Sequence, residues 1–126
     1  CATCHQGNGQ GVTGAFPPLD GVDWVTGDKG RIVRILLHGM QGPVEIQGVT
    51  YNGAMPAWGN QLSDEEIAAV ITHVRQSWSN EASEVVADEV RRVRNATQDR
   101  MQPWTAEELN ANRGIPGASA DTAATD

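Results

Sequence analysis

The chain has 126 residues, among them 14 glycines, one Phe and one Tyr, and its formal net charge at pH 7 is -7. This length allows one small domain with an appendage, and no apolar run approaches the ~20 residues that a membrane-spanning helix needs. The acidic balance argues against a nucleic-acid-binding surface, which requires clustered lysines and arginines.

The first five residues read CATCH, the Cys-x-x-Cys-His motif through which a c-type haem is attached. Two thiols three positions apart reach the two vinyl-derived carbons on one edge of a porphyrin, and the adjacent imidazole then lies under the iron. We therefore predict one haem c, bound covalently through Cys1 and Cys4, with His5 as an iron ligand.

Three other interpretations of the cysteine pair are weaker. A thioredoxin-like redox pair belongs near a βαβ pattern, and the sequence shows none. A structural zinc site needs four ligands and would have to recruit His38 or His73, neither of which has finger-like spacing. A disulfide would leave His5 without a role.

The next elements are a loop, a helix and a hairpin. Residues 6–14 contain four glycines and predict a loop that can lie close to the porphyrin edge. Apolar residues recur at helical spacing over residues 29–39 and predict a helix that Gly39 ends. Residues 44–51 alternate in polarity around a Gln-Gly pair and predict a short β-hairpin. An irregular extended loop explains these short arms equally well.

The second axial ligand has several candidates. Met55 lies in the stretch YNGAMPAWG, which is too rich in Gly and Pro for a helix or a central strand and predicts an ordered loop. Met40, at a predicted helix end, is interpreted as a packing residue, and Met101 lies beyond the compact part of the chain. His38 falls in the last turn of a helix, where an imidazole can cap free carbonyls, and His73 falls on a predicted solvent-facing side. We favour Met55 from its loop context and because c-type haem commonly has a Met/His ligand pair.

Three polar or aromatic residues are candidate partners of the haem propionates. Tyr51 and Trp58 flank Met55 and carry O–H and N–H donors. Arg34, on the predicted helix, can pair with a propionate. Trp58 can equally be a core residue and Arg34 a solvated helix residue, because nearness in sequence is the only support for these roles.

The rest of the chain is predicted to be helical and then flexible. Ser63 and Glu66 form a capping box before an apolar stripe that reaches Trp78, which predicts the last helix of a domain over residues 1–80. Residues 81–112 predict a helical extension, which either wraps the first domain or docks on a larger assembly. We expect its removal, with the tail, to leave the haem spectrum intact. Residues 113–126 lack an apolar period and predict a flexible tail.

Taken together, these features resemble class I cytochromes c. The CATCH motif, the segment FPPL at residues 16–19, the segment GAMP at residues 53–56 and the helix that follows occur in the order of that family. The resemblance implies a mainly α fold around one covalent haem, with a short β-hairpin before the Met loop and an extra helical C-terminal extension. It also implies Met55 as the distal ligand, Leu19 beside the haem, and a carbonyl near Pro17 that accepts the Nδ1 proton of His5.

One feature departs from that family. Class I domains usually begin with a helix that carries the haem motif in its last turn, whereas Cys1 is the first residue here. Because c-type haem is attached outside the cytoplasm, we expect an export signal ahead of Cys1 in a longer polypeptide. We expect the protein in the periplasm or on the extracytoplasmic face of a membrane.

The implied function is one-electron transfer without catalysis. The expected partners are a redox donor and a redox acceptor protein, or other subunits of a membrane-bound respiratory or dehydrogenase complex. The alternative is a catalytic or sensing haem, as in a peroxidase or a gas-binding protein, which needs an open distal position.

Overall fold

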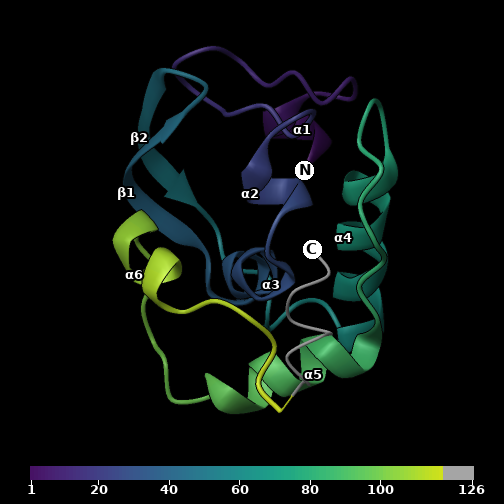
Figure 1. Cartoon of the computed structure of the whole chain (residues 1–126). Helices are drawn as coiled ribbons and strands as arrows, with labels where there is room; N and C mark the ends of the chain where they lie inside the picture. Colours follow the sequence, from purple (N-terminus) through teal and green to yellow (C-terminus); the bar gives the residue numbers. More distant parts are fainter. Residues whose placement is uncertain (118–126) are drawn as a thin grey trace.

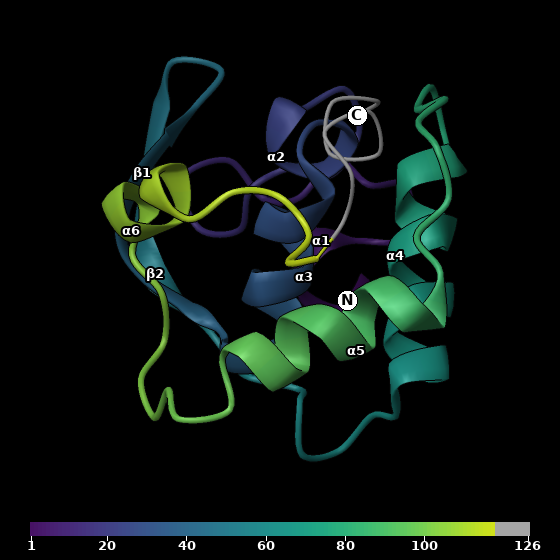
Figure 2. The same cartoon turned by 60° about the horizontal axis from the view of Figure 1, so that its bottom comes forward.

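A central helix lies between a β-hairpin on one side and a longer helix on the other (Figure 1). The computed structural model describes residues 1–117. In chain order its elements are α1 (Ala2–His5), α2 (Asp23–Thr26), α3 (Lys29–His38), β1 (Met40–Ile46), β2 (Val49–Met55), α4 (Asp64–Gln76), α5 (Ala87–Ala96) and α6 (Ala106–Ala111). Helix α3 is the central one, α5 packs on α3 and α4, and α6 packs on β1 (Figure 2). Within residues 1–117 no helix is both long enough and apolar enough to cross a bilayer.

Helices α3 and α4 confirm the predictions made from their caps. The side chain of Asp28 accepts the Arg31 amide proton at 2.9 Å at the start of α3, and Gly39, with φ 80°, ends that helix. Ser63 and Glu66 form a complete capping box at the start of α4. Helix α4 ends at Gln76, so Trp78 lies beyond its apolar stripe.

The predicted hairpin is present and longer than expected. Its two-residue turn has φ 53° at Gln47 and 80° at Gly48, the left-handed pair of a type I′ turn. The strands continue to the pair Met40↔Met55. The prediction of an ordered loop at Met55 is therefore wrong, because Met55 ends β2, and the placement of Met40 at a helix end is wrong as well, because Met40 begins β1. In a two-stranded ribbon both strands are edges, and edges tolerate the proline and glycines that argued against a strand.

The C-terminal part of the chain shares the core of the first part. Three of its side chains, Val90, Val93 and Leu109, are fully buried in the same cluster as Ile67 and Ile71 of α4. Helix α5 begins at Ala87, within the predicted helical extension of residues 81–112. The core therefore does not divide at residue 80.

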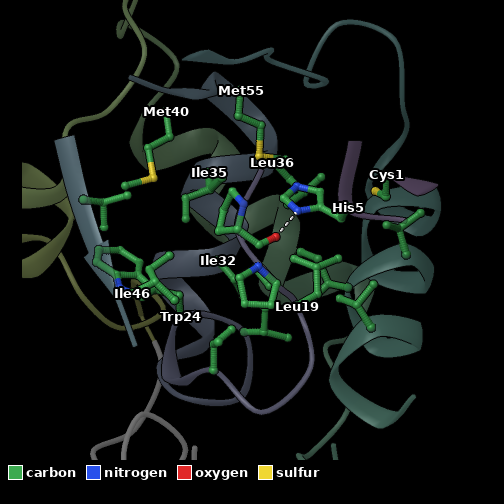
Figure 3. A pocket seen from close by; sticks show the side chains of 18 residues that line it. Cys1, His5, Leu19, Trp24, Ile32, Ile35, Leu36, Met40, Ile46 and Met55 are labelled. Atoms are coloured by element: carbon green, nitrogen blue, oxygen red, sulfur yellow. Dashed lines mark hydrogen bonds between the residues drawn. The ribbon is translucent and has the colours of Figure 1, made fainter. Parts of the chain in front are cut away.

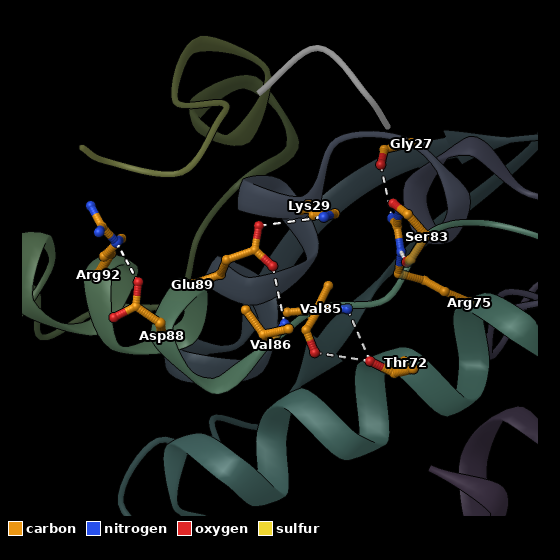
Figure 4. A network of polar contacts seen from close by, with 10 residues as sticks. All are labelled: Gly27, Lys29, Thr72, Arg75, Ser83, Val85, Val86, Asp88, Glu89 and Arg92. Atoms are coloured by element: carbon orange, nitrogen blue, oxygen red, sulfur yellow. Dashed lines mark hydrogen bonds and ion pairs between the residues drawn. The ribbon is translucent and has the colours of Figure 1, made fainter. Parts of the chain in front are cut away.

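Hydrogen bonds hold the segment that leads from α4 into α5 (Figure 4). The Thr72 hydroxyl on α4 donates to the Val85 carbonyl at 3.0 Å and accepts from the Val85 amide at 2.9 Å. The fully buried Arg75 guanidinium donates to the carbonyls of Gly27 and Ser83, both at 2.8 Å. These bonds satisfy backbone groups that burial would otherwise leave without partners.

Residues 113–117, expected in a flexible tail, lie against α3. The Asp28 carboxylate that caps α3 also accepts the Gly114 amide proton at 2.9 Å. Arg34 donates to the Gly114 carbonyl at 2.8 Å, and Ile115 is 6% exposed. The rest of the predicted tail, residues 118–126, lies outside the described residues.

Candidate haem site

Two adjoining cavities form a slot bounded by the hairpin, α3 and α4; Figure 3 shows the inner one. The inner cavity encloses about 690 Å³ of empty space, part of it open to solvent. Its walls are almost wholly apolar and include Ile32, Ile35, Leu36, Ile46, Ile71 and Val74. The apolar lining of this cavity therefore suits an apolar macrocycle.

His5 lines both cavities from the end of α1. Its Nδ1 donates a hydrogen bond to the Pro17 carbonyl at 2.7 Å, and its side chain is buried. A carbonyl only accepts, so the neutral ring carries its proton on Nδ1 and leaves the Nε2 lone pair available. Burial lowers the pKa of His5, although the bond to Pro17 opposes that shift. The expected contact with the Pro17 carbonyl is therefore present, and it leaves Nε2 as the ring nitrogen that could coordinate a metal.

The two cysteines lie on the same short helix as His5. The Cys1 carbonyl accepts from the amide of Cys4 at 3.2 Å and from the amide of His5 at 2.7 Å. One helical turn places Cys1 and Cys4 on one face, and both line the outer cavity as free thiols. Their position at the rim of the slot fits thioether attachment to the edge of a porphyrin.

Met55 is the last residue of β2 and lines both cavities together with His5 (Figure 3). The chain that follows is tied to the end of α3, because Trp58 and Gly59 donate to the Leu36 and Leu37 carbonyls at 2.8 and 3.1 Å. A Cβ on Gly39 would lie 2.5 Å from the Met55 carbonyl. The Met55 backbone is therefore fixed at the wall of the slot.

Met40 also lines both cavities, and the sequence interpretation missed it. It lies directly across the hairpin from Met55. A signal was available, because counting outward in strict register from the Gln47–Gly48 turn pairs residue 40 with residue 55. The helix prediction, carried through to residue 39, obscured that pairing.

The remaining predicted site residues divide into two groups. Leu19 and Pro17 line the inner cavity, and Tyr51 and Trp58 line the outer one. Arg34 lines neither, because its guanidinium lies against Gly114 on the C-terminal segment. The structure therefore does not bring Arg34 to the slot.

The other ligand candidates also lie away from the slot. His38 Nε2 is 2.8 Å from the Thr97 hydroxyl, and its ring meets Trp104 edge-on. His73 is exposed on α4, and Met101 is 90% exposed. Neither cavity is lined by any of these three side chains.

Gly11 permits the close approach that places the Pro17 carbonyl. A Cβ there would lie 2.2 Å from the Phe16 carbonyl oxygen, whereas a Cβ on Gly14 would meet nothing within 4 Å. Both glycines have positive φ, so replacement by Ala strains both backbones but crowds only Gly11. We expect Gly11→Ala to lower the unfolding free energy of the haem-loaded protein by about 2–5 kcal/mol.

The matched control is Gly14→Ala, for which we expect a loss of about 1–2 kcal/mol from the backbone strain alone. Denaturant unfolding followed by circular dichroism measures both losses. Equal losses would show that the chain at Phe16 moves away from Gly11 without cost.

Comparison with known proteins identifies the family of this chain. The family model described as Cytochrome c matches residues 1–78. Cytochrome c-552 of Thermus thermophilus is 44% identical over 117 residues, covering 90% of this chain and 78% of the relative.

The chain also resembles cytochrome subunits of dehydrogenases, but it covers a smaller share of their length. The cytochrome c subunit of a quinone-dependent alcohol dehydrogenase from Gluconacetobacter polyoxogenes is 36% identical over 97 residues, covering 75% of this chain and 20% of that subunit. The gluconate 2-dehydrogenase cytochrome c subunit of Pantoea cypripedii is 33% identical over 91 residues, covering 68% and 20%. The chain therefore belongs to the cytochrome c family of haem-containing electron carriers.

Proposed function

We propose that this chain transfers single electrons through one haem c, held by thioethers from Cys1 and Cys4 and by His5 and Met55 as axial ligands. The observation that carries the proposal is the burial of His5 and the hydrogen bond of its ring. Its ring is buried at the wall of an apolar slot, with Nδ1 committed to the Pro17 carbonyl. Only Nε2 then keeps a lone pair for coordination of the iron, and the Met55 side chain lines the same slot.

Each part of the chain has a distinct task in this function. When bound, haem supplies an iron that alternates between the ferrous and ferric states, and a thioether ligand raises its potential relative to a second imidazole. The aliphatic walls of the inner cavity give the macrocycle an apolar surrounding. The backbone bonds from Trp58 and Gly59 to α3 hold Met55 in place in both oxidation states. Tyr51 and Trp58 supply donors for the propionates at the outer cavity.

The named relatives support a place in an electron-transfer complex. Two of them are cytochrome c subunits of dehydrogenases, and a third is the FixP subunit of a cbb3-type cytochrome c oxidase from Azorhizobium caulinodans. We propose that this chain exchanges electrons with a redox donor and a redox acceptor of that kind. Because c-type haem is attached outside the cytoplasm, we propose that this exchange takes place in the periplasm or on the extracytoplasmic face of a membrane.

Carbon monoxide binding and the intact mass test the proposal. We expect the native chain to carry the mass of one haem, and the absorption spectrum of its ferrous form to stay unchanged under carbon monoxide, because both axial positions are filled. A catalytic or sensing haem has an open position, so prompt carbon monoxide binding by the unmodified ferrous protein would contradict the carrier function. A mass without haem would contradict covalent attachment.

A further inference from the structure

Met40 and Met55 form one cross-strand pair at the open end of the hairpin. Residues directly opposite each other on an antiparallel pair point to the same face, with Cβ atoms about 4.5–5.5 Å apart. Exposure alternates along β1, and the less exposed positions, Met40, Val44 and Ile46, face the inner cavity. The same wall therefore presents two thioethers to the slot.

Both methionines line the slot. Each is half-buried, and each lines the inner cavity drawn in Figure 3 as well as the outer cavity, as His5 does. Met101 differs, because it is 90% exposed and lines neither cavity. Two of the three methionines in the chain are thus available to a metal at the slot.

The backbone of Met40 is held at the wall of the slot by hydrogen bonds on both sides. The Trp104 amide donates to the Gly39 carbonyl at 2.9 Å, and the Gln41 amide donates to the Trp104 carbonyl at 2.8 Å. These bonds fix the chain on both sides of Met40 at the wall. The methionine side chain has three rotatable bonds and adapts to irregular space, so its sulfur can move along the slot.

We infer that Met40 is a reserve thioether ligand, which takes the iron position of Met55 when Met55 is removed. The inference rests on the proposed haem function and goes beyond it, because the site then stays closed to external ligands after losing its resident methionine. A purely packing role predicts instead that Met40 has no influence on coordination in any background.

Four haem-loaded proteins test this: the unmodified chain, Met40→Leu, Met55→Ala and the double variant. Leu approximates the volume of Met without its sulfur. We expect the unmodified protein and Met40→Leu to bind no carbon monoxide in the ferrous state. We expect Met55→Ala to bind it at least about tenfold more weakly than the double variant, because Met40 leaves only a small fraction of the sites open.

The outcomes separate the reserve ligand from the resident one. Equal carbon monoxide affinities of Met55→Ala and the double variant would overturn the inference and leave Met55 as the resident ligand. If Met40→Leu alone opened the site while Met55→Ala stayed closed, Met40 would be the resident ligand. That result would overturn both the inference and the assignment of Met55 in the proposed function.

A second measurement does not require the double variant to fold. In the variant Met55→Ala/Met101→Leu, Met40 is the only methionine left in the chain. With ¹³C-methyl-methionine, a methyl group coordinated above a ferrous porphyrin gives a resonance shifted far upfield by the ring current. One upfield methyl supports Met40 as the donor, and a methyl at its ordinary position overturns the inference.

Discussion

Removal of residues 81–126 is expected to abolish cooperative folding of the haem domain. The deletion takes away Val90, Val93 and Leu109, which are fully buried in the shared core. Each such side chain contributes about 1.5–3 kcal/mol, and a small domain has only about 5–15 kcal/mol of total stability. Calorimetry and the haem absorption spectrum of the truncated protein should show neither a sharp transition nor a normal low-spin haem.

This expectation replaces the one drawn from the sequence, in which the extension was separable. The matched control is a chain that ends at residue 117, which keeps every contact described above and should melt like the full-length protein. If the chain of residues 1–80 kept a sharp transition and a normal spectrum, residues 81–117 would be only an accessory layer.

Replacement of both Cys1 and Cys4 by Ser is expected to remove covalently bound haem. The two thiols line the outer cavity from one turn of helix, and in the proposed function each forms one thioether. After expression in a host that matures c-type cytochromes, haem staining of a denaturing gel should fall to background. An apolar slot left without its macrocycle exposes its walls to water, so we also expect a large loss of thermal stability.

The control for this variant is Thr3→Ala, which changes an exposed residue of the same helix between the two cysteines. It should retain full haem staining and its normal spectrum. Haem that stayed attached through denaturation in the double Ser variant would show that another residue forms the covalent bond.

Short sequence patterns predicted the parts of the fold that depend on interactions between residues close together in the chain. The Ser63–Glu66 capping box and the Gln47–Gly48 turn each settle their own geometry within a few residues. The carbonyl partner of His5 came instead from resemblance to a family, because twelve residues separate His5 from Pro17 and no local rule joins them.

What escaped prediction depends on contacts between distant segments. Arg34 had an open role at the haem until the structure placed it against Gly114, 80 residues away. Met40 lost its apparent helical context because the chain turns into a strand at that point, where Trp104 pairs with it. A short pattern around either residue contains no information about these partners.

The contact between the Asp28 carboxylate and the Gly114 amide bears on the order in which parts of the chain fold. It closes a loop of 86 residues, and contacts so far apart in the chain form more slowly than local ones. Because a polypeptide is synthesised from its N-terminal side, Cys1 and Cys4 are made well before Gly114, and the contact with Asp28 can form only afterwards. There is thus a stage at which both thiols exist in a polypeptide that has not yet closed around its core.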